Sequence, residues 1–278
     1  MSESAKRAQL TVLMDDTVNA TGLRAEHGLS FLLERDGHTA LFDCGQTDLF
    51  AGNAQALKKD LAPVEAIVLS HGHYDHTGGL PRALALAEGA AVHAHPDVRI
   101  LRYAKRRSGE FTSVGMPRGG EDIPADRLRL SAEPVEIVPG VWTTGEVPRL
   151  TDFEDTGGPF FLDGKGIRED GLVDDLSIFF ESGEGTVLLL GCAHAGVVNI
   201  LNRVADLTGR RSVHTVIGGM HLGSASEERV ERTCEAFEEF GVVRLGPTHC
   251  TGMPATVRFM SRFPDGAFLC PTGTSVLL

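Results

Sequence analysis

Residues 70–76, with the sequence SHGHYDH, place three histidines and one aspartate in one short segment. The apolar run at 66–69 before them predicts a buried strand, and two glycines after them predict a turn into a helix. Ligands usually bind at the carboxyl ends of strands in α/β sheets. Imidazole nitrogens and a carboxylate are ligands that zinc, iron and manganese accept. The segment therefore predicts a metal site, and the alternative is a solvated polar loop.

Short apolar runs alternate with helical segments along the rest of the chain, which predicts an α/β layered architecture. The predicted strands are residues 10–14, 29–34, 39–42, 66–70, 91–94, 135–138, 141–144, 176–181, 186–190, 213–217, 242–245 and 267–270. The predicted helices are residues 54–61, 80–87, 98–105, 197–206, 227–240 and 255–261. Two stretches echo each other: LFDCG, a helix and IVLSHGH, against LLLGCAH, a helix and VIGGMH. We interpret this echo as a weak internal duplication.

The length of 278 residues is compatible with two domains, but one large α/β domain spanning 1–278 is our expectation. Two stretches, about 106–126 and 149–174, lack a sustained hydrophobic period. Irregular segments of this length are typical of active-site lids and binding loops, or else of disordered insertions. We keep both readings for each stretch.

The charge balance of 26 basic against 38 acidic residues, a net −12, argues against sequence-independent nucleic-acid binding. It is compatible with an anionic small-molecule substrate, because metal ions or a few arginines can reverse the local field. The polar N-terminus has no apolar signal segment, and apolar runs such as 186–190 are too short to span a membrane. The five cysteines are scattered and do not suggest a disulfide framework. We therefore expect a cytoplasmic protein without membrane or nucleic-acid partners, and no pattern indicates its oligomeric state.

Several motifs together resemble the metallo-β-lactamase-fold superfamily. The HxHxDH loop at 71–76 is the superfamily signature, and FDCG at 42–45 and PTHC at 247–250 resemble a preceding strand end and a C-terminal histidine. Other segments resemble its dihydropterin-ribofuranosylaminobenzene-phosphate-synthase-like branch: EHGLS at 26–30, TGEVPR at 144–149, GCAHAG at 191–196, GGMHL at 218–222 and THCTG at 248–252. The resemblance covers nearly the whole chain.

This resemblance implies an αββα sandwich, two mixed β-sheets flanked by helices, with a dinuclear metal site in a cleft at one edge. His71 and His73 would bind the first ion, and Asp75, His76 and His249 the second. Two divalent ions are implied, zinc first, with manganese or iron as alternatives. Water bridging two such ions becomes a nucleophile near neutral pH.

The chain departs from the superfamily pattern between these motifs. The segment VDDLS at 173–177 has no histidine where the superfamily usually has one, and Cys192 stands where the resemblance places a bridging aspartate. His194 is the predicted substitute ligand, and its alternative role is to cap the following helix. Asp175 and Cys192 are further candidate ligands, and Cys192 is otherwise a small core residue.

Other residues have weaker signals. Asp75 and His221 are the predicted catalytic residues; His221 acts as a ligand or acid-base group, or else is a structural histidine. Glu146 is predicted as the hydrogen-bond partner of a ligating histidine, with ligand and solvated carboxylate as alternatives.

Three positive side chains lie in or beside the second irregular segment. Arg149 and Arg168, with Lys165 beside them, are candidates for holding a substrate phosphate or carboxylate, or else are surface charges. His93 and His95 form a second HxH pattern that we interpret as structural.

The leading functional hypothesis is a metallohydrolase in which a metal-activated hydroxide attacks an ester, lactone, amide or phosphoester. Three alternatives stay open. The branch resemblance suggests transfer of a pterin-methyl group from a pyrophosphate to an aminobenzene-ribose phosphate. A diiron site would support redox chemistry, and a metal-stabilised pocket without turnover would indicate a ligand-binding protein.

Overall fold

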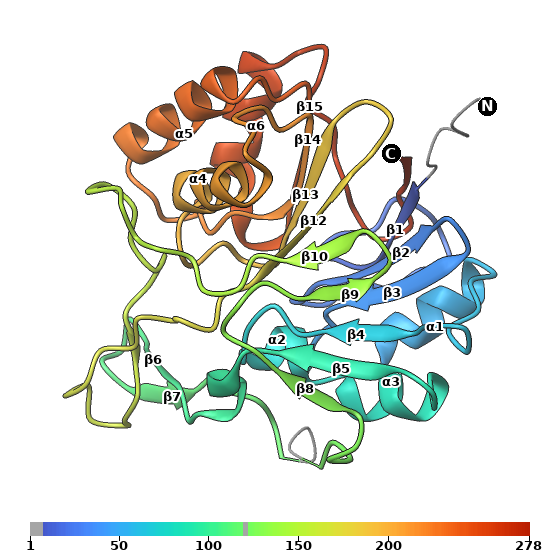
Figure 1. Cartoon of the computed structure of the whole chain (residues 1–278). Helices are drawn as coiled ribbons and strands as arrows, with labels where there is room; N and C mark the ends of the chain where they lie inside the picture. Colours follow the sequence, from blue (N-terminus) through green and yellow to red (C-terminus); the bar gives the residue numbers. More distant parts are fainter. Residues whose placement is uncertain (1–7, 119–121) are drawn as a thin grey trace.

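Two mixed β-sheets pack face to face in the computed structural model of the chain, which describes residues 8–118 and 122–278 (Figure 1). The first sheet contains, in spatial order, β16 (Ser275–Leu277), β1 (Ala8–Met14), β2 (Ser30–Arg35), β3 (His38–Phe42), β4 (Ala66–Val68), β5 (Ala91–Ala94) and β8 (Leu128–Leu130). The second contains β15 (Arg244–Thr248), β14 (Thr215–Gly219), β13 (Thr186–Leu190), β12 (Ser177–Glu181), β10 (Val141–Thr143) and β9 (Glu136–Val138). Each sheet joins a parallel part to an antiparallel part, as expected from the sequence.

Helices cover the outer face of each sheet (Figure 1). The helices α1 (Leu49–Ala56) and α3 (Leu80–Leu86) lie on the first sheet, and α4 (Val197–Thr208), α5 (Glu227–Glu239) and α6 (Met253–Arg262) lie on the second. The predicted αββα sandwich is confirmed. Among the described residues, no helix combines the length and apolar character needed to cross a membrane.

Three layers of buried apolar side chains follow from this arrangement. The central layer lies between the sheets and includes Leu10, Phe42, Val68, Ile178, Phe180 and Leu189. One outer layer joins the first sheet to α1 and α3, and the other joins the second sheet to α4, α5 and α6. Strands such as β13 are buried on both faces, which explains why their sequences are continuous apolar runs rather than alternating ones.

The predicted duplication has a structural counterpart. The unit β3–α1–β4 has parallel strands, and so has the unit β13–α4–β14. In both units the chain returns to the same end of its sheet, so that the polar residues after each strand lie at that end. Most candidate metal ligands follow β4 or β13 of these units, and His249 follows β15.

Two predicted elements are wrong. Residues 98–105 do not form a helix: a 3-10 turn (Pro96–Arg99) is followed by β6 (Tyr103–Lys105), because Arg102 between them is drawn into a buried ion-pair cluster. Residues 267–270 contribute only an isolated bridge from Ala267 to Leu245, and the last strand of the chain is β16 instead. The helix predicted at 54–61 begins earlier, at Leu49.

The stretches predicted as irregular contain short strands. β7 (Phe111–Ser113) and β11 (Phe160–Phe161) pair with the two edges of β6 and form a small third sheet beside the sandwich (Figure 1). Residues 119–121 of the first stretch lie outside the described residues, as do residues 1–7. The second stretch runs over the candidate site, as described below.

Candidate metal centre

The polar loops that follow five strands meet at one end of the sandwich. They carry Asp16 after β1, Asp43 after β3, His71 after β4, His194 after β13 and His249 after β15. Asp43, Ala193, His221 and His249 have positive φ angles of 61°, 54°, 46° and 45°. Such angles are uncommon outside glycine and are often found at functional sites.

His71, His73 and His194 form the first cluster of this end. Their ring centroids are 4.6 Å (His71–His73), 4.7 Å (His71–His194) and 5.0 Å (His73–His194) apart, and all three side chains are buried. His71 Nε2 faces His73 Nδ1 at 3.0 Å, and the Nδ1 of His71 lies 2.9 Å from Ser70 Oγ. His194 Nδ1 donates to the Thr156 carbonyl at 2.6 Å, whereas its Nε2 has no hydrogen-bond partner among the described residues. A buried polar atom without a partner is costly and points to a ligand.

Asp75, His76 and His249 form the second cluster. Asp75 Oδ2 lies 3.9 Å from His76 Nε2 and 3.4 Å from His249 Nε2. Carboxylates hold the far sides of both rings: Asp43 Oδ2 accepts from His76 Nδ1 at 2.6 Å, and Asp16 Oδ1 accepts from His249 Nδ1 at 2.6 Å. Carboxylates that hold the outer nitrogen of a histidine commonly orient metal ligands. Sequence reasoning assigned no role to Asp16 or Asp43, although Asp43 stands in the FDCG motif.

Cys192 lies between the two clusters. Its Sγ is 3.1 Å from His76 Nε2. It forms one group of possible ligand atoms with His71 and His194 and a second group with His76 and His249. Within each group the atoms lie within 4.8 Å of one another. The side chain is buried, and its position between the clusters fits the expected place of a bridging ligand.

The contacts of His194 and Asp175 bear on two of the sequence predictions. His194 does not cap α4, whose N-cap is Gly196. Asp175 belongs to none of the groups of possible ligand atoms found among the described residues. Its Oδ2 accepts a hydrogen bond from the Ala195 amide at 2.8 Å, one residue after His194. Burial raises the pKa of Asp175 to about 7.

The electrostatics differ between the clusters. Burial lowers the pKa of His71 and His194 well below the ordinary value and that of His73 to about 3, so these rings are neutral at pH 7, as metal binding requires. Burial acts in the same direction on His249, but its hydrogen bonds to Asp16 and Asp75 outweigh it and raise the pKa. An ion at His249 Nε2 would therefore displace a proton.

His27 stands at the open side of the second cluster. Its side chain is 51% exposed, with Nδ1 3.0 Å from Asp16 Oδ2 and Nε2 3.2 Å from Asp75 Oδ2. The hydrogen bond to Asp16, followed by that to Asp75, raises the pKa of His27 to about 9. His27 belongs to the EHGLS motif at 26–30, which sequence reasoning singled out without assigning a role to this residue. The structure places its cationic imidazole at the exposed side of the second cluster.

His221 and Phe160 border the first cluster. The His221 ring lies 4.4 Å from the His194 ring and packs against Gly157, where a Cβ atom would come within 2.2 Å of its Nδ1. The Phe160 ring lies 4.9 Å from His73, 5.3 Å from His194 and 6.0 Å from His221. The second irregular stretch, 149–174, thus supplies an aromatic cover for the histidines.

Three predicted site residues do not face the clusters. Glu146 Oε1 pairs with His95 Nε2 at 2.9 Å and is 54% exposed, so its predicted role as a ligand or as the partner of a ligating histidine does not fit its position. Arg149 donates to the carbonyl of His194 at 2.6 Å and to that of Gly171, and thereby ties two loops together. Arg168 is 68% exposed beside Asp163. Arg149 is thus engaged with backbone carbonyls and Arg168 lies at the surface, and substrate binding by either arginine stays a prediction.

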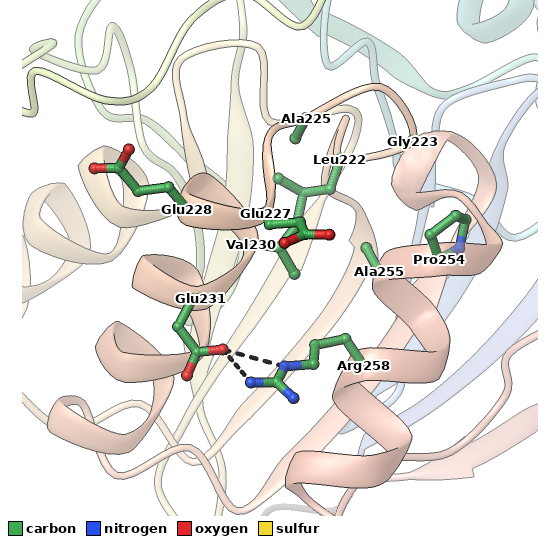
Figure 2. A pocket seen from close by; sticks show the side chains of 10 residues that line it. All are labelled: Leu222, Gly223, Ala225, Glu227, Glu228, Val230, Glu231, Pro254, Ala255 and Arg258. Carbon is green, nitrogen blue, oxygen red and sulfur yellow. Dashed lines mark hydrogen bonds and ion pairs between the residues drawn. The ribbon is translucent and has the colours of Figure 1, made fainter.

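A pocket of about 770 Å³ lies between α5 and α6 (Figure 2). Its walls carry Glu227, Glu228 and Glu231, and Glu231 is paired with Arg258. The pocket begins at Leu222, next to His221, but none of its lining residues belongs to the two clusters. The dense set of histidines, and not this pocket, carries the recognisable chemistry.

Comparison with known proteins gives consistent results. A family model described as the metallo-β-lactamase superfamily matches residues 23–249. A Methanocaldococcus jannaschii protein named 7,8-dihydropterin-6-methyl-4-(β-D-ribofuranosyl)-aminobenzene-5′-phosphate synthase is 30% identical over 253 residues, 87% of this chain and 86% of the relative. The crystal structure of Tm1679, titled a metal-dependent hydrolase of the β-lactamase superfamily, superposes with a TM-score of 0.82 at 29% identity, covering 97% of this chain and 98% of that one. Zn²⁺-bound PqqB from Methylobacterium extorquens, 17% identical with a TM-score of 0.54, covers 97% of this chain and all of its own (100%) and shares the fold.

Proposed function

Because this chain belongs to the metallo-β-lactamase superfamily, we propose that it is a dinuclear metal-dependent hydrolase of a small ester, lactone or phosphoester. The proposal is supported by the two clusters of ligand atoms at one end of the sandwich and by the similarity to Tm1679. The observation that carries it is that the buried Nε2 atoms of His73 and His194, in the cluster beside Cys192, lack hydrogen-bond partners in the described structure.

The first ion would be held by His71, His73 and His194, and the second by Asp75, His76 and His249. Cys192 would contribute its thiolate between them. A soft thiolate among imidazoles suits zinc better than manganese. Zinc is therefore the ion that we propose first.

Two divalent ions held there would lower the pKa of a water molecule and polarise the bond under attack. The residues of the chain prepare the site for this chemistry. Asp43 and Asp16 hold the Nδ1 atoms of His76 and His249, which directs each Nε2 toward the position of an ion. Phe160 shields the histidines from bulk water on one side, and the positive charge of His27 at the mouth favours an anionic substrate.

One observation favours a second candidate function. The named synthase from M. jannaschii matches this chain over most of both sequences. In that candidate, an aminobenzene-ribose phosphate would take the place of water as the acceptor of a pterin-methyl group, and pyrophosphate would leave. The same ligand residues would serve both reactions.

Elemental analysis of protein purified without added metal or chelator tests the metal centre. We expect nearly two zinc ions per chain in the wild type and in His38→Ala, whose imidazole lies on the surface beside Glu65. His73→Ala should lose at least one ion. Absence of metal from the wild type after reconstitution with zinc would overturn the proposal. Nearly two iron ions per chain would favour a redox enzyme over a hydrolase.

The loaded protein would then be assayed on phosphodiesters and lactones in water. Turnover that His73→Ala loses and His38→Ala keeps would support hydrolysis. Release of pyrophosphate from a pterin-methyl pyrophosphate, only when the aminobenzene-ribose phosphate is present, would support group transfer instead.

A further inference from the structure

Two cysteine thiols meet beside the candidate metal centre. Cys192 follows β13 and Cys250 follows β15, the two strands that flank β14 in the second sheet. Their Sγ atoms lie within 4.8 Å of each other, in one group with a ring nitrogen of His221. Cys250 Sγ is 3.8 Å from the Cys192 carbonyl oxygen, and the His221 amide donates to it at 3.3 Å.

Gly219, the last residue of β14, makes this meeting possible. A Cβ atom at Gly219 would lie 2.7 Å from Cys250 Sγ and 3.5 Å from the Cα of Cys192. Real Cβ atoms do not tolerate the shorter distance, so any larger residue would separate the two cysteines. The absent side chain leaves a space across which one thiol can reach the other.

The other three cysteines have no comparable arrangement. All five lie in the described part of the chain, where Cys44, Cys234 and Cys270 belong to three separate core clusters. Cys250 is the residue of this set with partial solvent exposure, whereas the other four cysteine residues are buried. An oxidant from solution would therefore reach Cys250 first, with Cys192 as the nearest thiol to respond.

We propose that Cys192 and Cys250 form a reversible oxidation site at which a peroxide converts the two thiols to a disulfide. In the first step the Cys250 sulfur takes an oxygen atom from hydrogen peroxide, giving a sulfenic acid and one water molecule. In the second step the Cys192 sulfur attacks the Cys250 sulfur, and the S–S bond forms as the S–O bond breaks. The hydroxyl group of the sulfenic acid leaves with the proton of the Cys192 thiol as a second water molecule. The two thiols lose two electrons, which the peroxide gains.

The bond requires only local movement. A disulfide has an S–S length of about 2 Å, and the sulfurs start within 4.8 Å of each other. The remaining approach is therefore less than about 3 Å, a distance within the reach of side-chain movement. Cys192 lies on the loop after β13, and Cys250 lies in the 3-10 turn His249–Thr251 after β15.

Disulfide formation has a consequence that rests on the proposed metal centre. Cys192 Sγ lies 3.1 Å from His76 Nε2, and it belongs to the ligand groups of both clusters. A sulfur engaged in a disulfide is no longer a thiolate and cannot serve as the ligand between two ions. Oxidation and full metal loading therefore exclude each other, and a reductant restores the loaded state.

Treatment of the metal-free full-length protein with hydrogen peroxide, followed by intact mass spectrometry and peptide mapping, tests the linkage itself. We expect the loss of two hydrogen atoms in mass, one peptide pair joined at Cys192 and Cys250, and reversal by dithiothreitol. Cys234→Ala, a change in a distant core cluster, should keep the linkage, and Cys250→Ser should abolish it. A gain of oxygen atoms at Cys250 without any linked peptide would overturn the proposal.

The zinc-loaded protein tests the consequence. Peroxide should release zinc to a chromogenic chelator in proportion to the linked fraction, and Cys250→Ser should retain its zinc under the same treatment. Linkage while zinc stays bound would overturn the exclusion. If the wild type never binds zinc, the proposed hydrolase fails, but linkage in the metal-free protein still stands or falls on its own measurement.

Discussion

Replacing Asp43 by asparagine tests how the second cluster is prepared for an ion. The Asp43 side chain is fully buried; its Oδ1 accepts from the Ser70 amide at 2.7 Å, and its Oδ2 accepts from Ser70 Oγ at 2.7 Å and His76 Nδ1 at 2.6 Å. In Asp43→Asn the amide oxygen must face the Ser70 N–H, since a second donor there would repel it. The amide NH₂ group then faces His76 Nδ1, so the imidazole keeps its proton on Nε2 instead.

The expected loss follows from this change of tautomer. His76 Nε2, the atom that faces Cys192 and Asp75, would carry a proton that an incoming ion must displace. Loss of a group that orients a metal ligand typically lowers affinity about 10- to 100-fold, equivalent to about 1.4–2.8 kcal/mol. The second ion should be affected most, because Asp43 contacts His76 directly and reaches the first cluster only through Ser70 Oγ, which lies 2.9 Å from His71 Nδ1.

Competition with a chromogenic chelator would measure the two zinc affinities of Asp43→Asn, with circular dichroism to establish that the variant is folded. Asp152→Asn is the matched control, since this aspartate is 88% exposed and is paired with Arg232 at the surface. If folded Asp43→Asn bound both ions with the affinity of the wild type, then Asp43 would not set the tautomer of His76, or His76 would not bind through Nε2.

Three further predictions concern stability. Arg102→Met should lower the free energy of unfolding by about 3–5 kcal/mol, because it leaves the buried Asp170 and Asp174 without their cationic partner. Urea unfolding would measure this loss, and a loss below about 1 kcal/mol would contradict the prediction. His27 has a folded pKa of about 9, above its unfolded value of about 6.5, so its stabilisation is present below pH 6.5 and disappears as the pH rises through 9. For this half-exposed side chain we expect at most about 1 kcal/mol, seen as a difference between the metal-free wild type and His27→Gln at pH 6 that vanishes at pH 10. Chelation of bound zinc should lower the melting temperature, since each ion at about 100 times its dissociation constant adds about 2.7 kcal/mol; an unchanged melting temperature after complete removal would count against ligands in the folded core.

Much of the architecture could be predicted from local sequence. Continuous apolar runs such as that of β13 predict buried strands, and strands were found at every predicted position except 267–270. The exception, and the helix wrongly predicted at 98–105, have a common physical cause. Arg102 is fixed by Asp170 and Asp174, which lie far along the chain, and the end of the chain pairs with β1 at its beginning. No local periodicity carries such contacts.

The candidate ligands divide in the same way. His71, His73, Asp75 and His76 occupy one short loop, and their spacing alone indicated a metal site. The partners that orient the rings and the thiols that face each other were determined by the tertiary structure: Asp16 meets His249 across 233 positions of sequence, and Cys192 meets Cys250 only because parallel strands bring their ends together. Local sequence determines which residues can bind a metal, because side-chain chemistry and strand patterning are local properties. The alignment of the two sheets decides which of them meet, because it brings together loops that the chain itself keeps far apart.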